Sequence, residues 1–205
     1  MEKFERFTAP AVPIVENNLD TDQLCPKQHL KTIHREGFDK ALFSDRRFDT
    51  DGNAIADFVL NRPEYASAGI LVGGENFACG SSREHAVWAL VDYGIRCVIA
   101  PSYGEIFLQN TVNSGLLAIT LSPSEVARLA AVAMDKPGSL WTVDLPGQTI
   151  TAPGLEPIAF SIEPERKERL VNGLDEVSLT LAHHAEIAAF AERQRQTEPW
   201  LWDHA

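Results

Sequence analysis

The sequence is poor in cysteine and has no long apolar run, and each shortage argues against a class of protein. Its three cysteines, Cys25, Cys79 and Cys97, are an odd number and lie far apart. They therefore give neither a disulfide framework nor a zinc knuckle, and the chain alone could not ligate an iron–sulfur cluster in the usual way. No apolar segment approaches the ~20 residues of a membrane helix, and the N-terminal segment lacks a signal-peptide pattern. We expect a soluble, cytoplasmic protein.

Basic residues are also scarce. Lysine and arginine number 18 against 29 aspartates and glutamates, which gives a net charge of −11. Nonspecific attraction to nucleic acid or to an anionic membrane is therefore not expected. Residues 27–48 reverse this balance, because they hold six basic and three acidic residues. This segment is either a solvated surface whose charges pair locally or a cationic wall for a small anion.

The hydrophobic pattern from residue 69 to 120 alternates between strand-like and helix-like segments. Short apolar runs predict buried strands, and apolar residues at helical spacing predict helices between them. The predicted strands are 69–73, 95–100 and 116–120, and the predicted helices are 82–93 and about 103–114. Continuous apolar strands joined by helices indicate an α/β fold with a largely parallel sheet flanked by helices.

The pattern changes in the last third of the chain. A Ser-x-x-Glu capping box with proline directly after its serine predicts a helix that begins after Ser122. Short antiparallel strands follow, then a helix from about Pro164 and a long amphipathic stretch that ends at Gln196. We expect a single domain, residues 1–205, with a C-terminal β and α extension from about residue 141.

The densest chemistry lies in residues 73–85, between a predicted strand and a predicted helix, where open α/β sheets bind ligands. The segment has neither the spacing of a phosphate-binding Walker loop nor the glycine of a nucleophile elbow. Cys79 is either a thiolate near a helix start or an inert packing residue. Ser81 and Glu84 form a second capping-box pattern, so Ser81 either only caps the helix or joins Arg83 in a carboxylate or oxyanion site.

Residues 76–86 resemble the Gly-Ser-Ser-Arg-Glu-His signature of the swivel domain in aconitase-type dehydratases. Three further segments, 18–27, 100–117 and 172–181, agree with it in the same order and resemble the family of 3-isopropylmalate dehydratase small subunits. The resemblance covers about residues 4–195. It implies an aconitase-type swivel domain, a layered β/β/α fold with a mostly parallel sheet and a C-terminal β and α extension.

The resemblance also implies an activity. Members of this family are hydro-lyase subunits that interconvert 2-isopropylmalate and 3-isopropylmalate through 2-isopropylmaleate in leucine biosynthesis. A separate large subunit would hold a 4Fe–4S cluster, one iron of which acts as a Lewis acid on the substrate. We therefore expect no metal site in this chain, a heterodimer or higher assembly, a small 2-hydroxy dicarboxylic acid substrate, and activity only with the large subunit.

The resemblance assigns roles to individual residues. Ser81 matches the serine that acts as a base on the substrate C–H bond. Ser82 and Arg83 match residues that bind a substrate carboxylate. Thr21 and Asp22 match residues in a turn that borders the site.

Residues 29–32 match the loop with which the family selects its substrate. Leu30 could pack on an isopropyl group, whereas Lys31 either points away from the pocket or points inward and favours an acid with an additional carboxylate. Two alternatives therefore stay open. One is the small subunit of a related hydro-lyase acting on homoaconitate, methylmalate or dimethylmalate, and the other is a non-catalytic carboxylate-binding module with the same fold.

Two positions near the signature depart from the family pattern. Ala78 stands where glycine is frequent, and Tyr103 stands where phenylalanine is frequent. Neither departure affects Ser81 or Arg83.

Overall fold

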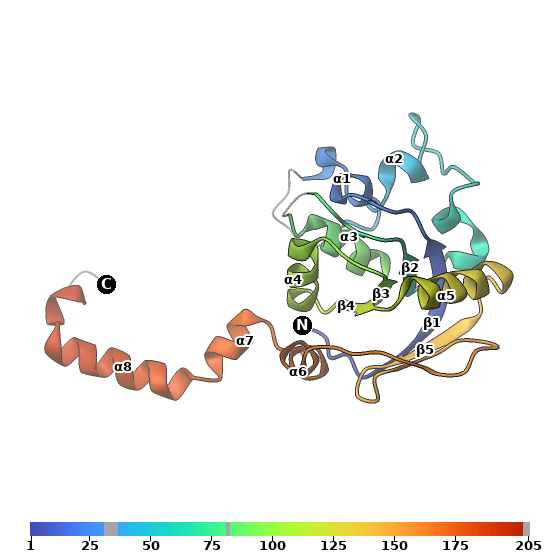
Figure 1. Cartoon of the computed structure of the whole chain (residues 1–205). Helices are drawn as coiled ribbons and strands as arrows, with labels where there is room; N and C mark the ends of the chain where they lie inside the picture. The colour runs from blue at the N-terminus through green and yellow to red at the C-terminus, as the bar shows by residue number, and fades with distance from the viewer. Residues whose placement is uncertain (31–36, 81–82, 203–205) are drawn as a thin grey trace.

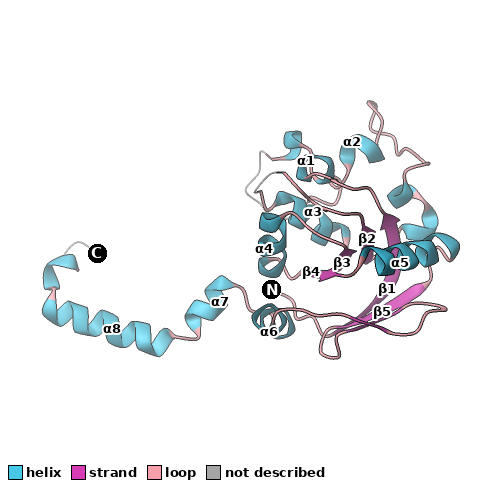
Figure 2. Cartoon of the chain, in the orientation of Figure 1, coloured by secondary structure: helices cyan, strands magenta, loops and turns pink. Residues whose placement is uncertain are grey.

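The computed structural model describes residues 1–30, 37–80 and 83–202. Seven strands form one sheet in the order β4-β3-β2-β1-β5-β6-β7 (Figures 1 and 2). The strands are β1 (Arg6–Ile14), β2 (Ile70–Gly73), β3 (Cys97–Ala100), β4 (Leu117–Thr120), β5 (Leu140–Asp144), β6 (Thr149–Thr151) and β7 (Ile158–Ala159).

Helices and single helical turns connect and extend the sheet. The α-helices are α1 (Thr21–Leu24), α2 (Ser44–Arg47), α3 (His85–Tyr93), α4 (Glu105–Asn113), α5 (Pro123–Asp135), α6 (Pro164–Asn172), α7 (Glu176–Leu181) and α8 (His184–Thr197). The 3₁₀ turns are η1 (Lys27–His29), η2 (Val59–Asn61), η3 (Pro63–Tyr65) and η4 (Pro199–Leu201).

Strands β1 to β4 form the parallel half of the sheet, and both of its faces are covered. Because side chains alternate along a strand, Leu71 of β2 packs into one core with α3 and α4, and Ile70 packs into a second core with α5. This double burial explains why the sequence shows these strands as continuous apolar runs. The predicted α/β layering is confirmed.

Strand β1 joins the two halves of the sheet by changing partner along its length. Its first half, Arg6–Pro10, pairs antiparallel with β5, and residues 11–14 pair parallel with β2. The extension continues outward through the antiparallel strands β6 and β7. Trp141 of β5 is fully buried in the same core as α5, so the extension shares the core of the parallel half.

Most predicted elements are present within a few residues of their expected bounds. The capping box at Ser122 is confirmed, because its hydroxyl accepts the Glu125 N–H and the Glu125 carboxylate accepts the Ser122 N–H. The helix expected from Pro164 begins there. No element was predicted over β1, and the amphipathic stretch ending at Gln196 contains the two helices α7 and α8.

The C-terminal helices lie apart from the rest of the fold. Figure 1 shows α7 and α8 extending away from the sheet and its helices, with the C-terminus at the far end. No residue of either helix is buried. In the part of the chain that the structure describes, no helix is both long enough and apolar enough to span a membrane.

Candidate active site

Two segments far apart in sequence lie side by side beyond the carboxyl ends of β1 and β2. The Asn18 N–H donates to the Glu75 carbonyl at 2.8 Å, and the Thr21 N–H donates to the Cys79 carbonyl at 2.9 Å. Residues 18–22 are thereby bonded to the loop 74–80, which leads into the predicted signature. These backbone bonds bring together two of the motifs that the sequence singled out.

A third segment holds the other side of the loop. The Phe77 N–H donates to the Ser102 carbonyl at 3.0 Å, and the Gly104 N–H donates to the Phe77 carbonyl at 2.9 Å. The buried Tyr103 hydroxyl donates toward the Ile119 carbonyl oxygen, 2.7 Å away, a bond that phenylalanine would lack. Burial raises the pKa of Tyr103 well above its usual value, so this hydroxyl stays protonated as a donor. The departure at Tyr103 therefore anchors the segment that supports the loop.

The loop has an unusual backbone conformation. Asn76, Ala78 and Gly80 all have positive φ angles, of 53°, 56° and 99°. Asparagine tolerates this region, but alanine does not favour it, so tertiary bonds must hold Ala78 there. One such bond joins side chains, because the Asn76 amide donates to the Asn18 side-chain oxygen at 2.9 Å. The loop is thus preorganised by its neighbours.

Close packing at Gly104 gives a test of this preorganisation. A Cβ added at Gly104 would lie 2.5 Å from the Ala78 carbonyl oxygen, which is a backbone clash. We expect Gly104→Ala to destabilise the fold by about 1–3 kcal/mol and to lower the melting temperature by several degrees. In the matched variant Gly147→Ala, the added Cβ would lie 3.1 Å from the Asp144 carboxylate, which is a side chain that can shift. This variant should lower the melting temperature by less than Gly104→Ala does. Equal melting temperatures for the two variants would show that the loop adapts freely.

Two of the predicted site residues, Arg83 and Asp22, form an ion pair. An Arg83 guanidinium nitrogen donates to the Asp22 carboxylate at 2.9 Å, and the two side chains are 41% and 57% exposed. An exposed pair contributes only about 0–1 kcal/mol, so an incoming carboxylate can exchange with Asp22. Thr21 is buried beside this pair, at the start of α1. The structure therefore brings together three of the predicted site residues, at a guanidinium that already binds the carboxylate of Asp22.

Helix α3 begins later than the sequence predicts. Its first residue is His85, and its N-cap is Glu84, whose own side chain makes no capping hydrogen bond. The observed start lies three residues beyond the predicted start at residue 82. Ser81, Ser82 and Lys31 lie outside the described residues, so their assigned roles stay predictions.

Leu30 is half-buried, follows η1 and packs against the core formed with α3. Its role in selecting a substrate side chain stays a prediction.

Two arginines of the basic segment 27–48, Arg46 and Arg47, are bonded within the fold. Arg46 makes two bonds to the Glu16 carboxylate, at 2.9 and 2.5 Å, and its guanidinium lies over the Phe58 ring. Arg47 donates to the Asp39 carbonyl at 2.7 Å. For Arg46 and Arg47, these bonds favour the interpretation as a paired surface over the interpretation as a cationic wall for an anion.

A cavity of about 240 Å³ adjoins the site loop, and the sequence did not predict its far wall. That wall is the first turn of α4, including Glu105 and the exposed Ile106. The family resemblance covers these residues within segment 100–117 but assigns them no role in the site, and their placement depends on how the 101–104 segment packs against the loop. Cys79 also lines the cavity, and its thiol donates to the Asn18 carbonyl at 3.5 Å, which favours a packing role.

Comparison with known proteins adds a second line of evidence. The family model of the aconitase C-terminal domain matches residues 1–124, and the model of the C-terminal domain of 3-isopropylmalate dehydratase small subunits matches residues 176–202. The chain is 51% identical to a 3-isopropylmalate dehydratase small subunit of Parvibaculum lavamentivorans, over 98% of this chain and 100% of the relative. It is 50% identical to that of Paramagnetospirillum magneticum, over the same shares.

A solved structure confirms the fold. A 3-isopropylmalate dehydratase structure from Methanocaldococcus jannaschii superposes with a TM-score of 0.67 and 24% identity, covering 90% of this chain and 98% of that chain. At this identity, the likeness supports the architecture and not the substrate.

Proposed function

The chain belongs to the family of 3-isopropylmalate dehydratase small subunits, and from this we propose that it interconverts 2-isopropylmalate and 3-isopropylmalate together with a large subunit. The reaction is a dehydration followed by rehydration and serves leucine biosynthesis. The structural observation that carries the proposal is the Arg83–Asp22 pair, which joins two motifs of the family at one loop cluster.

We assign the roles in the reaction by the matched motif. Ser81 removes the proton from the substrate C–H bond, and Ser82 and Arg83 hold a substrate carboxylate. A serine hydroxyl is a weak base at its ordinary pKa, so its alkoxide needs nearby positive charge. Arg83, two residues along the chain, supplies that charge. Asp22 holds the guanidinium in place before the substrate arrives, and the buried Thr21 fixes the start of α1 beside it.

Membership of the aconitase family suggests a 4Fe–4S cluster in the complete enzyme, and this chain's cysteines do not fit as its ligands. Cys25 and Cys97 are buried, and burial raises the pKa of Cys25 to about 11 and that of Cys97 further still. Both are therefore kept as thiols, whereas a cluster binds thiolates. Among the described residues, no group of three or more His, Cys, Asp or Glu side chains could hold a metal ion. We propose that the large subunit holds the cluster.

We further propose a cytoplasmic protein whose partners are the large subunit and a 2-hydroxy dicarboxylic acid. The net charge of −11 argues against nonspecific binding to nucleic acid or to an anionic membrane.

The substrate itself is tested by comparing acids in the reconstituted enzyme. We expect kcat/KM for 2-isopropylmalate to exceed that for homoaconitate, methylmalate and dimethylmalate. The Lys31→Gln variant should keep this order, because in an enzyme for an isopropyl substrate we expect an ammonium in this loop to avoid the apolar pocket. A wild-type preference for homoaconitate that collapses in Lys31→Gln would instead assign the related hydro-lyase. Binding of these acids without turnover in the complete complex would assign the non-catalytic module.

A further inference from the structure

The last part of the described chain forms an exposed apolar segment. We call residues 176–202, which comprise α7, α8 and η4, the C-terminal arm. Eleven large hydrophobic residues are exposed among the described residues, and six of them lie in the arm. These six are Val177, Leu181, Ile187, Phe190, Trp200 and Leu201. Single exposed hydrophobic residues are ordinary on a protein surface, but this concentration indicates an interaction surface.

Spacing places these side chains on shared helix faces. Val177 and Leu181 are four residues apart on α7, and Ile187 and Phe190 are three apart on α8. Such pairs are neighbours on one side of a helix. An isolated helix of 14 residues, the length of α8, is marginally stable in water, and helices in proteins gain most of their stability by burying an apolar face. The arm therefore has the features of a helix pair that is completed by a partner.

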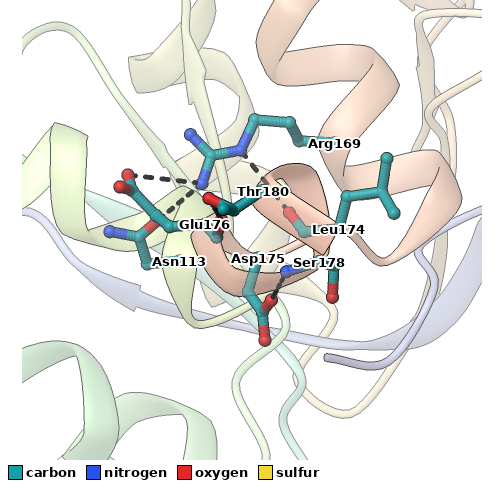
Figure 3. A network of polar contacts seen from close by, with 7 residues as sticks. All are labelled: Asn113, Arg169, Leu174, Asp175, Glu176, Ser178 and Thr180. Carbon is teal, nitrogen blue, oxygen red and sulfur yellow. Dashed lines mark hydrogen bonds and ion pairs between the residues drawn. The ribbon is translucent and has the colours of Figure 1, made fainter. Parts of the chain in front are cut away.

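The root of the arm is held firmly to the rest of the fold (Figure 3). Arg169 of α6, whose side chain is only 14% exposed, donates to the Asn113 side-chain oxygen at 2.6 Å and lies 3.7 Å from the Glu176 carboxylate. The Asp175 carboxylate caps α7 by accepting the Ser178 N–H at 2.7 Å. These bonds connect the first turn of the arm to the end of α4, so the arm leaves the fold in a defined direction.

Helix α4 connects this root with the candidate active site. At its first turn, Ile106 lines the cavity beside the site loop and is 43% exposed. Farther along, Gln109, Asn110 and Asn113 line a polar cavity of about 400 Å³ that Arg169 and Glu176 also border. One face of the molecule therefore runs from the site to the arm, and a partner that covers the site can reach the arm along α4.

The two family matches separate the arm from the domain that carries the site. The domain match, residues 1–124, bears the name of an aconitase C-terminal domain, and the arm match bears the name of a small subunit. A C-terminal domain is tied to the rest of its enzyme by the peptide chain, whereas a separate subunit needs a non-covalent attachment.

We propose that the arm is this attachment, and that its exposed apolar face binds an apolar groove on the large subunit. The inference rests on the function proposed above. The arm holds the large subunit over the active site and takes no part in the chemistry.

The test replaces the apolar face of α8 and measures binding of the full chain to the purified large subunit. In Ile187→Ser/Phe190→Ser, the Kd should rise about 10- to 100-fold, as expected for two interface anchors. The control Glu192→Ser/Gln196→Ser changes the opposite face of α8 and should change the Kd less than about threefold. The melting temperature should stay unchanged in both variants, because α8 has no buried residue.

Turnover separates attachment from chemistry. The apolar-face variant should need about 10- to 100-fold more large subunit for half-maximal turnover, yet reach the wild-type kcat at saturation. An unchanged Kd in this variant would overturn the arm proposal and leave the proposed function standing. Loss of self-association in the variant with an unchanged Kd for the large subunit would assign the arm to a second copy of this chain. Failure of the wild type to bind the large subunit would overturn both proposals.

Discussion

Replacing Ser81 with alanine is expected to reduce turnover of the reconstituted enzyme by about 10²- to 10⁴-fold, because the variant lacks the group that takes the substrate proton. Affinity for the large subunit should not change, since one hydroxyl contributes little to an interface of this kind. The loss of stability should not exceed that of one helix cap, about 0.5–2 kcal/mol. Turnover per folded molecule and calorimetry measure the two effects separately.

The matched control is Ser122, the serine of the other Ser-x-x-Glu pattern. Ser122→Ala removes the hydroxyl that accepts the Glu125 N–H at the start of α5, so it should cost about 0.5–2 kcal/mol of stability. Its kcat per folded molecule should remain that of the wild type. If Ser81→Ala instead behaved like Ser122→Ala, less stable but equally active, then Ser81 would have a structural role only.

Replacing Arg83 with lysine is expected to lower kcat/KM by about 10- to 100-fold, although the positive charge is kept. A guanidinium presents parallel N–H donors that match a carboxylate, whereas an ammonium is a point charge, and hydrogen bonds to charged groups contribute about 1.5–3 kcal/mol. Most of the loss should appear in KM, because the carboxylate is bound before the proton is removed. Steady-state kinetics with 2-isopropylmalate measures this.

Arg6→Lys serves as the control for this charge-conserving change. Arg6 also donates to an aspartate, Asp144, at 2.9 Å, but it lies at the first residue of β1, at the opposite end of the strand from the site. Its kcat/KM should match that of the wild type. Wild-type kcat/KM in Arg83→Lys would mean that Arg83 provides only charge and does not orient the substrate.

The parallel strands and their helices could be predicted from the sequence because each has a strong local pattern. Strand β1 could not, because Pro10 and Pro13 argue against a strand in the middle of a sheet. The structure accommodates them where β1 changes partner. Pro10 is in register with β5, at its last antiparallel position, and toward β2 only its carbonyl is used, which accepts the Gly69 N–H. Pro13 pairs only with β2, so neither position requires an N–H from the proline in two ladders.

The two Ser-x-x-Glu patterns of the sequence, at Ser122 and Ser81, are followed by helices that begin at different distances from the serine. The Ser-x-x-Glu pattern at Ser122 starts α5, where Pro123 fixes the backbone of the first helical position. The same pattern at Ser81 has no such proline, and the helix starts at His85. Local sequence thus proposes a helix start, but the neighbouring residue and the packing of the loop decide it.

The resemblance assigned Asp22 and Arg83 to one site, and in the structure they form an ion pair. The supporting bonds could not be predicted in the same way. The pairing of residues 18–22 with the loop 74–80, and of Phe77 with Tyr103, joins segments whose contacts depend on the complete fold. The first turn of α4 borders the site for the same reason, because the resemblance covers Glu105 and Ile106 but assigns them no role there.

The most direct test of the central claim is turnover of 2-isopropylmalate to 3-isopropylmalate by the separate and combined subunits. This chain alone and the cluster-loaded large subunit alone should each be inactive. When this chain is added to the large subunit, activity should rise until the two are present in the stoichiometry of their complex. Turnover by this chain alone, or a saturated complex that leaves 2-isopropylmalate unchanged, would contradict the assignment.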